Sequence, residues 1–181
     1  EANPDDLDKN FLKDLAKTEI NRLSIGTQSF FEEDLKLMNR AHNASEAESS
    51  IKRAQDFGFE NLSIDLIYGS PTSNFEIWKQ NLQKTIELQV PHVSSYALTI
   101  EPKTALNAWI KKNKISRPER STQNKEFYYL SDFLKDQGFI HYEISNFAKK
   151  DFESKHNSAY WKYKEYLGIG PSAHSYNGRN Q

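Results

Sequence analysis

Three stretches of the sequence have the composition of β-strands, and stretches of helical length separate them. They run from Arg22 to Gln28, from Asn61 to Tyr68 and from Val93 to Ile100. Repeated succession of a strand and a crossover helix predicts βα units and therefore a parallel sheet. The second stretch is apolar on both sides except at Asp65, which is typical of a parallel strand covered on two faces.

The ends of two intervening helices are predicted from capping signals. Ser29 with Glu32, and Ser45 with Glu48, match the capping box, in which two side chains bond reciprocally to free backbone N–H groups. Gly58 is a natural residue to follow the end of the second of these helices. Helices are therefore expected after residue 29 and between residues 45 and 58.

Apolar spacing and end signals predict the other helices. They are a first helix opening at Asn3-Pro4, one with Phe75, Trp78, Leu82 and Ile86 on one stripe, one over 104–112 and one over 121–137. After these, Phe139 to Phe147 alternates enough to be a further strand, and a loop-rich, aromatic segment follows. We therefore expect residues 1–115 to form βα units and residues 116–181 to continue them with a helix, a strand and loops.

Three or four parallel strands are too few to close a barrel, and an open set leaves edges that need partners. In addition, Glu1 stands directly before a helix with no strand ahead of it. These features favour a piece of a larger barrel, truncated at the N-terminus. A complete small α/β sheet domain is the alternative.

The composition excludes several kinds of protein. The 181 residues contain no cysteine, so this stretch holds neither a disulfide nor a thiolate-bound zinc or iron-sulfur site. A net charge of -1 gives no basic footprint for nucleic acid. No stretch approaches the roughly 18 consecutive apolar residues of a membrane span, and no secretory leader is recognisable. A cytoplasmic location is the expectation.

Polar residues mark the βα repeats at or near the ends of strands. They are Glu1, Gln28, Arg40 and Asp65. Barrel enzymes build their ligand sites from residues that follow the carboxyl ends of parallel strands. Asp65 would be costly to bury without a partner, so a ligand or a structural arginine is expected beside it. Arg40 by itself is more typical of a solvated cation near a helix end.

Several segments together resemble the oxygen-independent coproporphyrinogen III oxidase group of radical-SAM proteins. They are Glu1-Ala2-Asn3-Pro4, Ser24-Ile25-Gly26-Thr27-Gln28-Ser29-Phe30, Leu37-Met38-Asn39-Arg40-Ala41-His42, Ile64-Asp65-Leu66-Ile67-Tyr68-Gly69 and Tyr142-Glu143-Ile144-Ser145-Asn146-Phe147. Within that group, His156-Asn157-Ser158-Ala159-Tyr160-Trp161 resembles the heme-chaperone (HemW-type) branch, as does Ser29, where the oxidase branch typically has an acidic residue.

The resemblance implies a partial parallel (β/α) barrel of the radical-SAM type, with additional α+β elements at its C-terminal side. It implies a [4Fe-4S] cluster and S-adenosylmethionine in the intact protein. The family's cluster-binding cysteine loop would lie before Glu1, so this chain by itself is expected to be inactive.

By the same resemblance, Glu1, Gln28, Arg40 and Asp65 fall on S-adenosylmethionine-binding positions, and Thr99 falls on another. The side chains suit that ligand. A carboxylate accepts hydrogen bonds from ribose hydroxyls, an arginine pairs with the methionyl carboxylate, and a glutamine donates and accepts. The partner of each residue is left open.

His156 is the candidate ligand for heme iron, with Tyr160 and Trp161 as an aromatic wall for the porphyrin. The alternative is a histidine that donates a ring N–H to a loop carbonyl above packed aromatic rings. His174 is a second candidate, for which a structural loop role is favoured.

Three functions remain open at this stage. The first is binding of heme and its transfer to an acceptor protein on a radical-SAM scaffold. The second is oxidative decarboxylation of coproporphyrinogen III, in which case the intact protein is an oxidoreductase. The third is an α/β domain without an intact site. The branch motif favours the heme chaperone, with heme or a porphyrin and a heme acceptor as partners.

Overall fold

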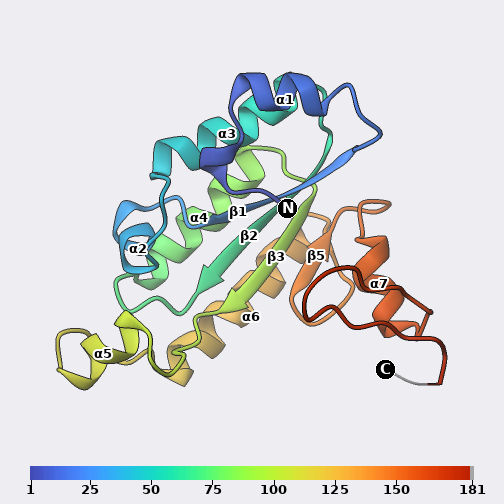
Figure 1. Cartoon of the computed structure of the whole chain (residues 1–181). Coiled ribbons are helices and arrows are strands. Elements are labelled where there is room, and N and C mark those ends of the chain that lie inside the picture. The colour runs from blue at the N-terminus through green and yellow to red at the C-terminus, as the bar shows by residue number, and fades with distance from the viewer. Residues whose placement is uncertain (180–181) are drawn as a thin grey trace.

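The strands form a five-stranded sheet in the order β1-β2-β3-β5-β4 (Figure 1). The computed structural model describes residues 1–179. The strands are β1 (Arg22–Gln28), β2 (Asn61–Tyr68), β3 (His92–Ala97), β4 (Ile140–His141) and β5 (Asn146–Ala148). β1, β2 and β3 are parallel, whereas β5 runs antiparallel to β3 and to β4. The predicted parallel sheet is confirmed. Its strands stand in one open row, as in a partial barrel.

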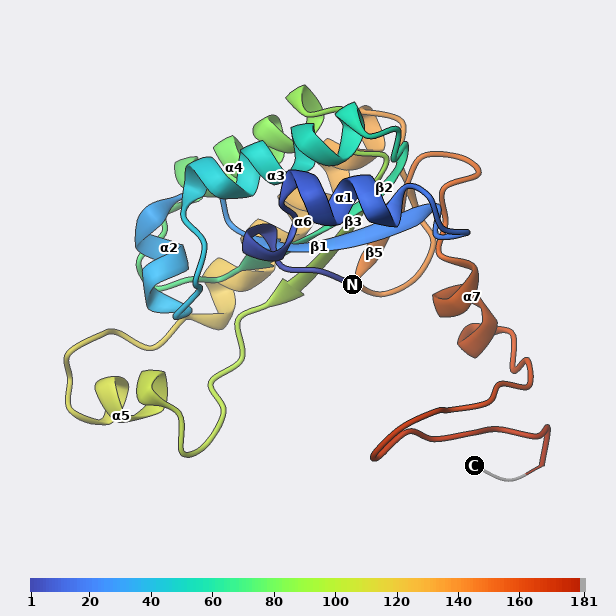
Figure 2. The same cartoon turned by 45° about the horizontal axis from the view of Figure 1, so that its top comes forward.

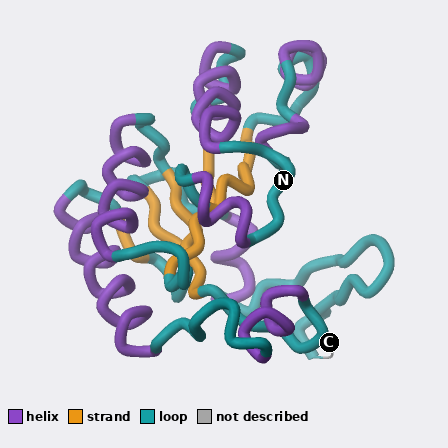
Figure 3. Tube along the Cα trace, turned by 90° about the vertical axis from the view of Figure 1, so that its left-hand side faces the viewer, coloured by secondary structure: helices purple, strands orange, loops and turns teal. Residues whose placement is uncertain are grey.

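Helices cover one side of this sheet. The helical elements are η1 (Pro4–Asp6), α1 (Lys9–Leu15), α2 (Glu32–Leu37), α3 (Ala44–Asp56), α4 (Phe75–Glu87), α5 (Ala105–Lys111), α6 (Arg120–Asp136) and α7 (Lys155–Trp161). Figure 2 shows α3, α4 and α6 on the same side of the strands, while α7 and the C-terminal segment extend away from them. The tube in Figure 3 shows the same layering of helices against strands.

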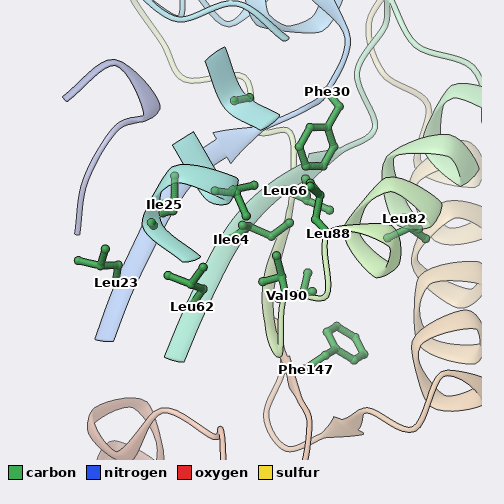
Figure 4. Close-up of a cluster of buried hydrophobic side chains, with 14 of the residues drawn as sticks. Leu23, Ile25, Phe30, Leu62, Ile64, Leu66, Leu82, Leu88, Val90 and Phe147 are labelled. Carbon is green, nitrogen blue, oxygen red and sulfur yellow. The ribbon is translucent and has the colours of Figure 1, made fainter. Parts of the chain in front are cut away.

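The apolar core lies between the sheet and these helices. Every second residue of β1 and β2 points into it, among them Leu23, Ile25, Leu62, Ile64 and Leu66 (Figure 4). Side chains from α3, α4 and α6 complete the layer; they are Ala47, Ile51, Ala54, Trp78, Leu82, Leu130 and Leu134. Burying one such side chain contributes about 1.5–3 kcal/mol. This contribution is what fixes the helices on that face.

The residues that alternate with the core are polar. On β2 they are Ser63 and Asp65, which pair in register with His92 and Ser94 of β3. On β1 they are Arg22 and Ser24. The prediction that β2 is apolar on both sides except at Asp65 is therefore wrong. The strand alternates, because only one of its faces packs against helices.

The backbone of Ala2 extends the sheet beyond β1. Its N–H donates to the carbonyl of Ser24 at 2.9 Å, and the N–H of Gly26 donates to the carbonyl of Ala2 at 2.9 Å. The pairing is parallel. It brings Glu1 to the polar face of the sheet.

Both predicted capping boxes are wrong, although both helices exist. The box at α3 is formed by Asn43 and Glu46. At α2, Phe31 occupies the N-cap position without a side-chain bond, and Ser29 Oγ donates to Asp34 instead at 2.9 Å. The predicted end of this helix at Gly58 is confirmed, since Gly58 directly follows the C-cap Phe57 of α3 and has a φ of 87°.

The first helix is also divided differently from the prediction. Asn3 makes no capping bond, and a 3₁₀ turn precedes a helix that begins after Asp8, whose side chain accepts from the N–H of Phe11. Asn3 binds Arg40 instead. Its carboxamide oxygen accepts a hydrogen bond from Arg40 at 2.7 Å.

The predicted strand over Phe139–Phe147 is wrong. The segment forms a hairpin, in which β4 and β5 are antiparallel and β5 adds to the edge of β3. Residues 142–145 turn between them, because Glu143 accepts bonds from the N–H of Ser145 and the side chain of Asn146. The third strand is shorter than predicted and ends at Ala97, so Thr99 lies beyond it. Strands from residues 1–115 and from residues 116–181 thus form one sheet.

The segment expected to be loops contains the helix α7, which is capped by Ser154. Among the helices of residues 1–179, none has the length and apolarity that crossing a membrane requires.

Candidate functional site

A polar cleft of about 320 Å³ lies on the uncovered face of the sheet. Its walls come from β1, β2, β3 and α7, and its lining residues are Glu1, Arg22, Ser24, Ser63, Asp65, His92, Ser94, Tyr96, Ser154, His156 and Asn157. The cleft therefore joins two of the predicted S-adenosylmethionine residues, Glu1 and Asp65, with the predicted heme ligand His156. Asp65 and His156 lie 91 positions apart in the sequence, and the sheet and the hairpin bring them together.

Asp65 is a half-buried carboxylate of this cleft. Ser24 Oγ donates to its Oδ1 at 3.4 Å, and Ser94 also hydrogen-bonds to the carboxylate. Burial raises the pKa of Asp65, and the nearby charge of Glu1 raises it further, while the two serine bonds act in the opposite direction. No ion pair to Asp65 occurs within residues 1–179. The structural arginine that was one alternative is thus absent there.

A second hollow of about 690 Å³ lies at the carboxyl ends of the strands. It contains Gln28, Arg40 and Thr99, together with apolar side chains from β2, from the segment after β3, from α5 and from α2 with its C-cap. Those side chains are Leu37, Met38, Ile67, Leu98, Ala105, Leu106 and Trp109. The five predicted S-adenosylmethionine residues are therefore divided between two hollows. The apolar walls of this one suit a ring or a methylene chain.

Gly26 brings the polar residues of the second hollow together. A Cβ atom on Gly26 would lie 3.1 Å from Gln28 Nε2, 3.2 Å from an Arg40 Nη2 atom and 3.6 Å from Asn3 Oδ1. Gln28 itself has a φ of 66°, and it pairs with Leu66 of β2 after a register shift between Ile25 and Gln28. The bulge and the absence of a side chain at Gly26 let Gln28 fold back toward Arg40.

The guanidinium of Arg40 is partly satisfied. Its Nη2 donates to Asn3 at 2.7 Å and to the carbonyl of Gly26 at 3.2 Å. Its Nε is buried and has no hydrogen-bond partner within the part of the chain that the structure describes. The side chain does not bond to the carbonyls at the end of α2, which was the alternative interpretation. An unpaired buried N–H on a cation is a donor that an anionic ligand could satisfy.

His156 lies on α7 and is exposed. Its ring stands edge-on to Tyr160, with 4.9 Å between the ring centroids. Within residues 1–179 the imidazole makes no hydrogen bond, which leaves the alternative of a histidine bonded to a loop carbonyl without support. Trp161 does not share this wall, because its indole N–H donates to Glu143 at 3.2 Å and its ring lines a different hollow.

His92 and Tyr142 belong to the cleft region but were not predicted as site residues. His92 Nδ1 lies 2.6 Å from Ser63 Oγ, and its Nε2 lies 2.8 Å from the hydroxyl of Tyr142. Burial lowers the pKa of His92 to about 3, and the charge of Arg22 acts in the same direction. The ring is therefore neutral at ordinary pH. The signal that identifies it is its spacing of two from Ser94 on the same strand.

Two other histidines lie outside the cleft. His42, close to Arg40 in the sequence, is buried, and its Nε2 lies 3.1 Å from the carbonyl of Thr27. Burial lowers its pKa. His174 is exposed on the C-terminal segment, where it lines neither hollow.

The donor set fits S-adenosylmethionine better than a metal cluster. A carboxylate held by hydroxyls and an arginine with a free buried N–H suit ribose and carboxylate groups. The sequence has no cysteine, and no cluster of three His, Asp or Glu side chains among residues 1–179 has the geometry of a metal site. The described residues therefore do not fit a [4Fe-4S] cluster.

Comparison with known proteins connects this geometry to a superfamily. Residues 1–85 match the model of the Radical SAM superfamily. Heme chaperone HemW of Lactococcus lactis subsp. lactis (strain IL1403) is 39% identical over 176 residues, covering 97% of this chain and 46% of that protein. Heme chaperone HemW of Bacillus subtilis (strain 168) is 37% identical over 178 residues, covering 98% and 47% respectively. The chain spans about half the length of the curated relatives it matches.

The fold is similar to that of a solved structure, coproporphyrinogen III oxidase (HemN) from Escherichia coli, a radical SAM enzyme. The TM-score is 0.79 at 25% identity, covering 97% of this chain and 43% of that one. Residues 1–85 therefore match the radical SAM superfamily, and the chain as a whole is similar to the HemW heme chaperones.

Proposed function

We propose that this chain is part of a radical-SAM protein that binds heme and passes it to acceptor proteins in the cytoplasm. The relatives named as heme chaperones align with nearly the whole chain. The observation that carries the proposal is the cleft in which Asp65 and His156 face the same space. It combines a candidate contact for S-adenosylmethionine with a candidate heme ligand.

Five residues would hold S-adenosylmethionine. Asp65 would accept hydrogen bonds from the ribose hydroxyls, since its present partners are only serine hydroxyls. Arg40 would pair with the methionyl carboxylate through its free Nε, and Gln28 beside it would donate or accept. Glu1 and Thr99 would complete the two hollows. When bound at a reduced cluster, S-adenosylmethionine supplies radical chemistry; these residues would bind and orient it.

The cluster itself would be held by residues outside this chain, because the sequence contains no cysteine. Heme would be bound at His156. An imidazole with no hydrogen bond of its own within residues 1–179 is a suitable axial ligand for iron, and the ring of Tyr160 next to it offers an apolar contact for the porphyrin edge.

Isothermal titration of the full-length natural protein with S-adenosylmethionine tests the first part. An Asp65→Ala variant should bind at least about tenfold more weakly, because it loses charged hydrogen bonds. Asp56→Ala is the matched control, since Asp56 is an exposed aspartate at the end of α3. Equal affinity of wild type and Asp65→Ala would contradict the assignment.

Heme titration followed by magnetic circular dichroism tests the second part. His156→Ala should weaken heme binding at least about tenfold and change the iron ligation. His174→Ala should behave as wild type, because His174 lies on the exposed C-terminal segment. If His156→Ala keeps the wild-type spectrum and affinity, the heme site is elsewhere.

The second candidate function is oxidation of coproporphyrinogen III, which the similarity in fold to the Escherichia coli oxidase favours. Full-length protein with a reconstituted cluster should then convert coproporphyrinogen III in the presence of S-adenosylmethionine. Absence of turnover together with heme uptake would remove this candidate.

A further inference from the structure

The helix that carries His156 has little apolar packing to hold it. α7 has seven residues, and none of them is buried. A helix of this length is not stable by itself in water, so its position must come from tertiary contacts. Those contacts are polar, and they begin on the sheet.

A buried hydrogen-bonded chain connects β2 and β3 with the hairpin. Ser63 on β2 contacts His92 on β3, and His92 contacts the hydroxyl of Tyr142, with distances of 2.6 and 2.8 Å. The rings of His92 and Tyr142 also touch, with 5.7 Å between their centroids. Ser63 and His92 are each 1% exposed, so both groups depend on these bonds. Burial keeps the imidazole neutral, so one ring nitrogen donates and the other accepts.

Tyr142 also contacts α7 and its N-cap. Its hydroxyl accepts the backbone N–H of Ser154 at 3.2 Å, and it also bonds to the side chain of Asn157. Ser154 is the N-cap of α7, and its Oγ accepts from the N–H of Asn157 at 3.2 Å. The two α7 contacts of Tyr142 thus lie on either side of His156 in the sequence.

A second attachment lies at the start of β1. Arg22 donates to the carbonyl of Phe152 at 3.3 Å and to the side chain of Asn61. It fixes the turn before α7. Two hairpin residues then contact α7 directly: Tyr142 at its first turn, and Glu143, which accepts the indole N–H of Trp161 at 3.2 Å, at its last.

We propose that His92 and Tyr142 are positioning residues, which hold α7 so that His156 faces the polar cleft. The proposal rests on the proposed heme site at His156. The neutral imidazole connects the sheet to Tyr142, and Tyr142 sets the first turn of the helix.

A Tyr142→Phe substitution in the full-length natural protein tests the proposal, because it removes only the hydroxyl. Tyr128→Phe is the control, since Tyr128 is 67% exposed on α6. Amide hydrogen exchange over residues 154–159 should be roughly three- to tenfold faster in Tyr142→Phe. Heme affinity should fall by a similar factor, with a changed magnetic circular dichroism spectrum, while the affinity for S-adenosylmethionine stays within about twofold.

His92→Gln provides a second variant that keeps a polar group at the same site. His92→Phe removes both ring nitrogens. His92→Gln should raise amide exchange and weaken heme binding less than His92→Phe does. Unchanged exchange over residues 154–159 in Tyr142→Phe and in His92→Phe would overturn the proposal. Failure of this proposal can be told apart from failure of the heme site. The exchange measurement needs no heme, whereas the heme site is contradicted if His156→Ala binds heme as the wild type does.

Discussion

At the scale of single residues, Asp65 is a carboxylate whose charge this sheet face compensates only in part. The residue is half-buried, and serine hydroxyls are its hydrogen-bond partners. Burial raises its pKa, and Glu1 nearby disfavours the charge further. Two hydroxyls compensate a buried charge only in part. Such residues at functional sites commonly lower the stability of the free protein.

Asp65→Asn should therefore stabilise the ligand-free protein while it weakens binding of S-adenosylmethionine. At neutral pH the uncharged amide avoids the cost of burying the charge, and we expect a gain in the free energy of unfolding on the order of 1 kcal/mol. Urea unfolding without ligand measures it. Ser24→Ala, which removes a hydroxyl that bonds Asp65, should destabilise instead. A loss of stability in Asp65→Asn would mean that the carboxylate has a structural role.

At the scale of elements, the helix ends depend on contacts that a motif search places incorrectly. At α3 the capping box is formed by Asn43 and Glu46, with bonds of 2.9 Å and 2.8 Å between each side chain and the other's backbone N–H. Ser45 and Glu48 have the same spacing, but they lie inside the helix. There the Glu48 carboxylate pairs with Lys52 and Lys84.

Asn43→Ala should lower the free energy of unfolding by about 1 kcal/mol, the usual cost of an N-cap. Ser45→Ala is the matched control, because it alters the other candidate cap and removes no capping bond. Chemical unfolding of both variants separates the two assignments. If Ser45→Ala lowered the free energy of unfolding as much or more, Ser45 would be the N-cap, as the sequence motif predicts.

At the scale of the whole molecule, His92 connects the parallel strands to the hairpin and to α7. Its hydrogen-bond partners are far apart in the chain. Ser63 lies on β2, and Tyr142 lies in the turn after β4. Protonation of His92 would remove the acceptor in this chain of hydrogen bonds. The free energy of unfolding should therefore depend on pH through protonation of His92.

Stability should fall as the pH falls from about 6.5 toward 3, because the pKa of His92 is about 3 in the folded protein and near 6.5 when unfolded. In that interval the unfolded chain binds more protons, so acid favours unfolding; above it the contribution is fully present. Urea unfolding between about pH 7 and pH 4 should show a steeper loss in wild type than in His92→Gln. Parallel curves would contradict the assignment.

Much of the architecture follows from local signals in the sequence. The bounds of β1 and β2 agree with the predicted strands, and α4, α5 and α6 lie within a residue or so of the predicted helices. These elements have strong periodicity and clear ends. Gln28, Arg40 and Asp65 were selected by their positions and by family resemblance, and the structure divides them between the cleft on the sheet face and the hollow at the carboxyl ends of the strands. Their binding of S-adenosylmethionine stays a prediction.

The sequence by itself determined the parallel βα core, because alternation and capping are properties of neighbouring residues. Only the tertiary structure decided that residues 139–148 form a hairpin on β3, since the pairing of a short strand depends on the edge available to it. It also decided that His92 is buried between Ser63 and Tyr142, and that His156 faces Asp65. Such contacts join residues far apart in the chain, and no local pattern encodes them.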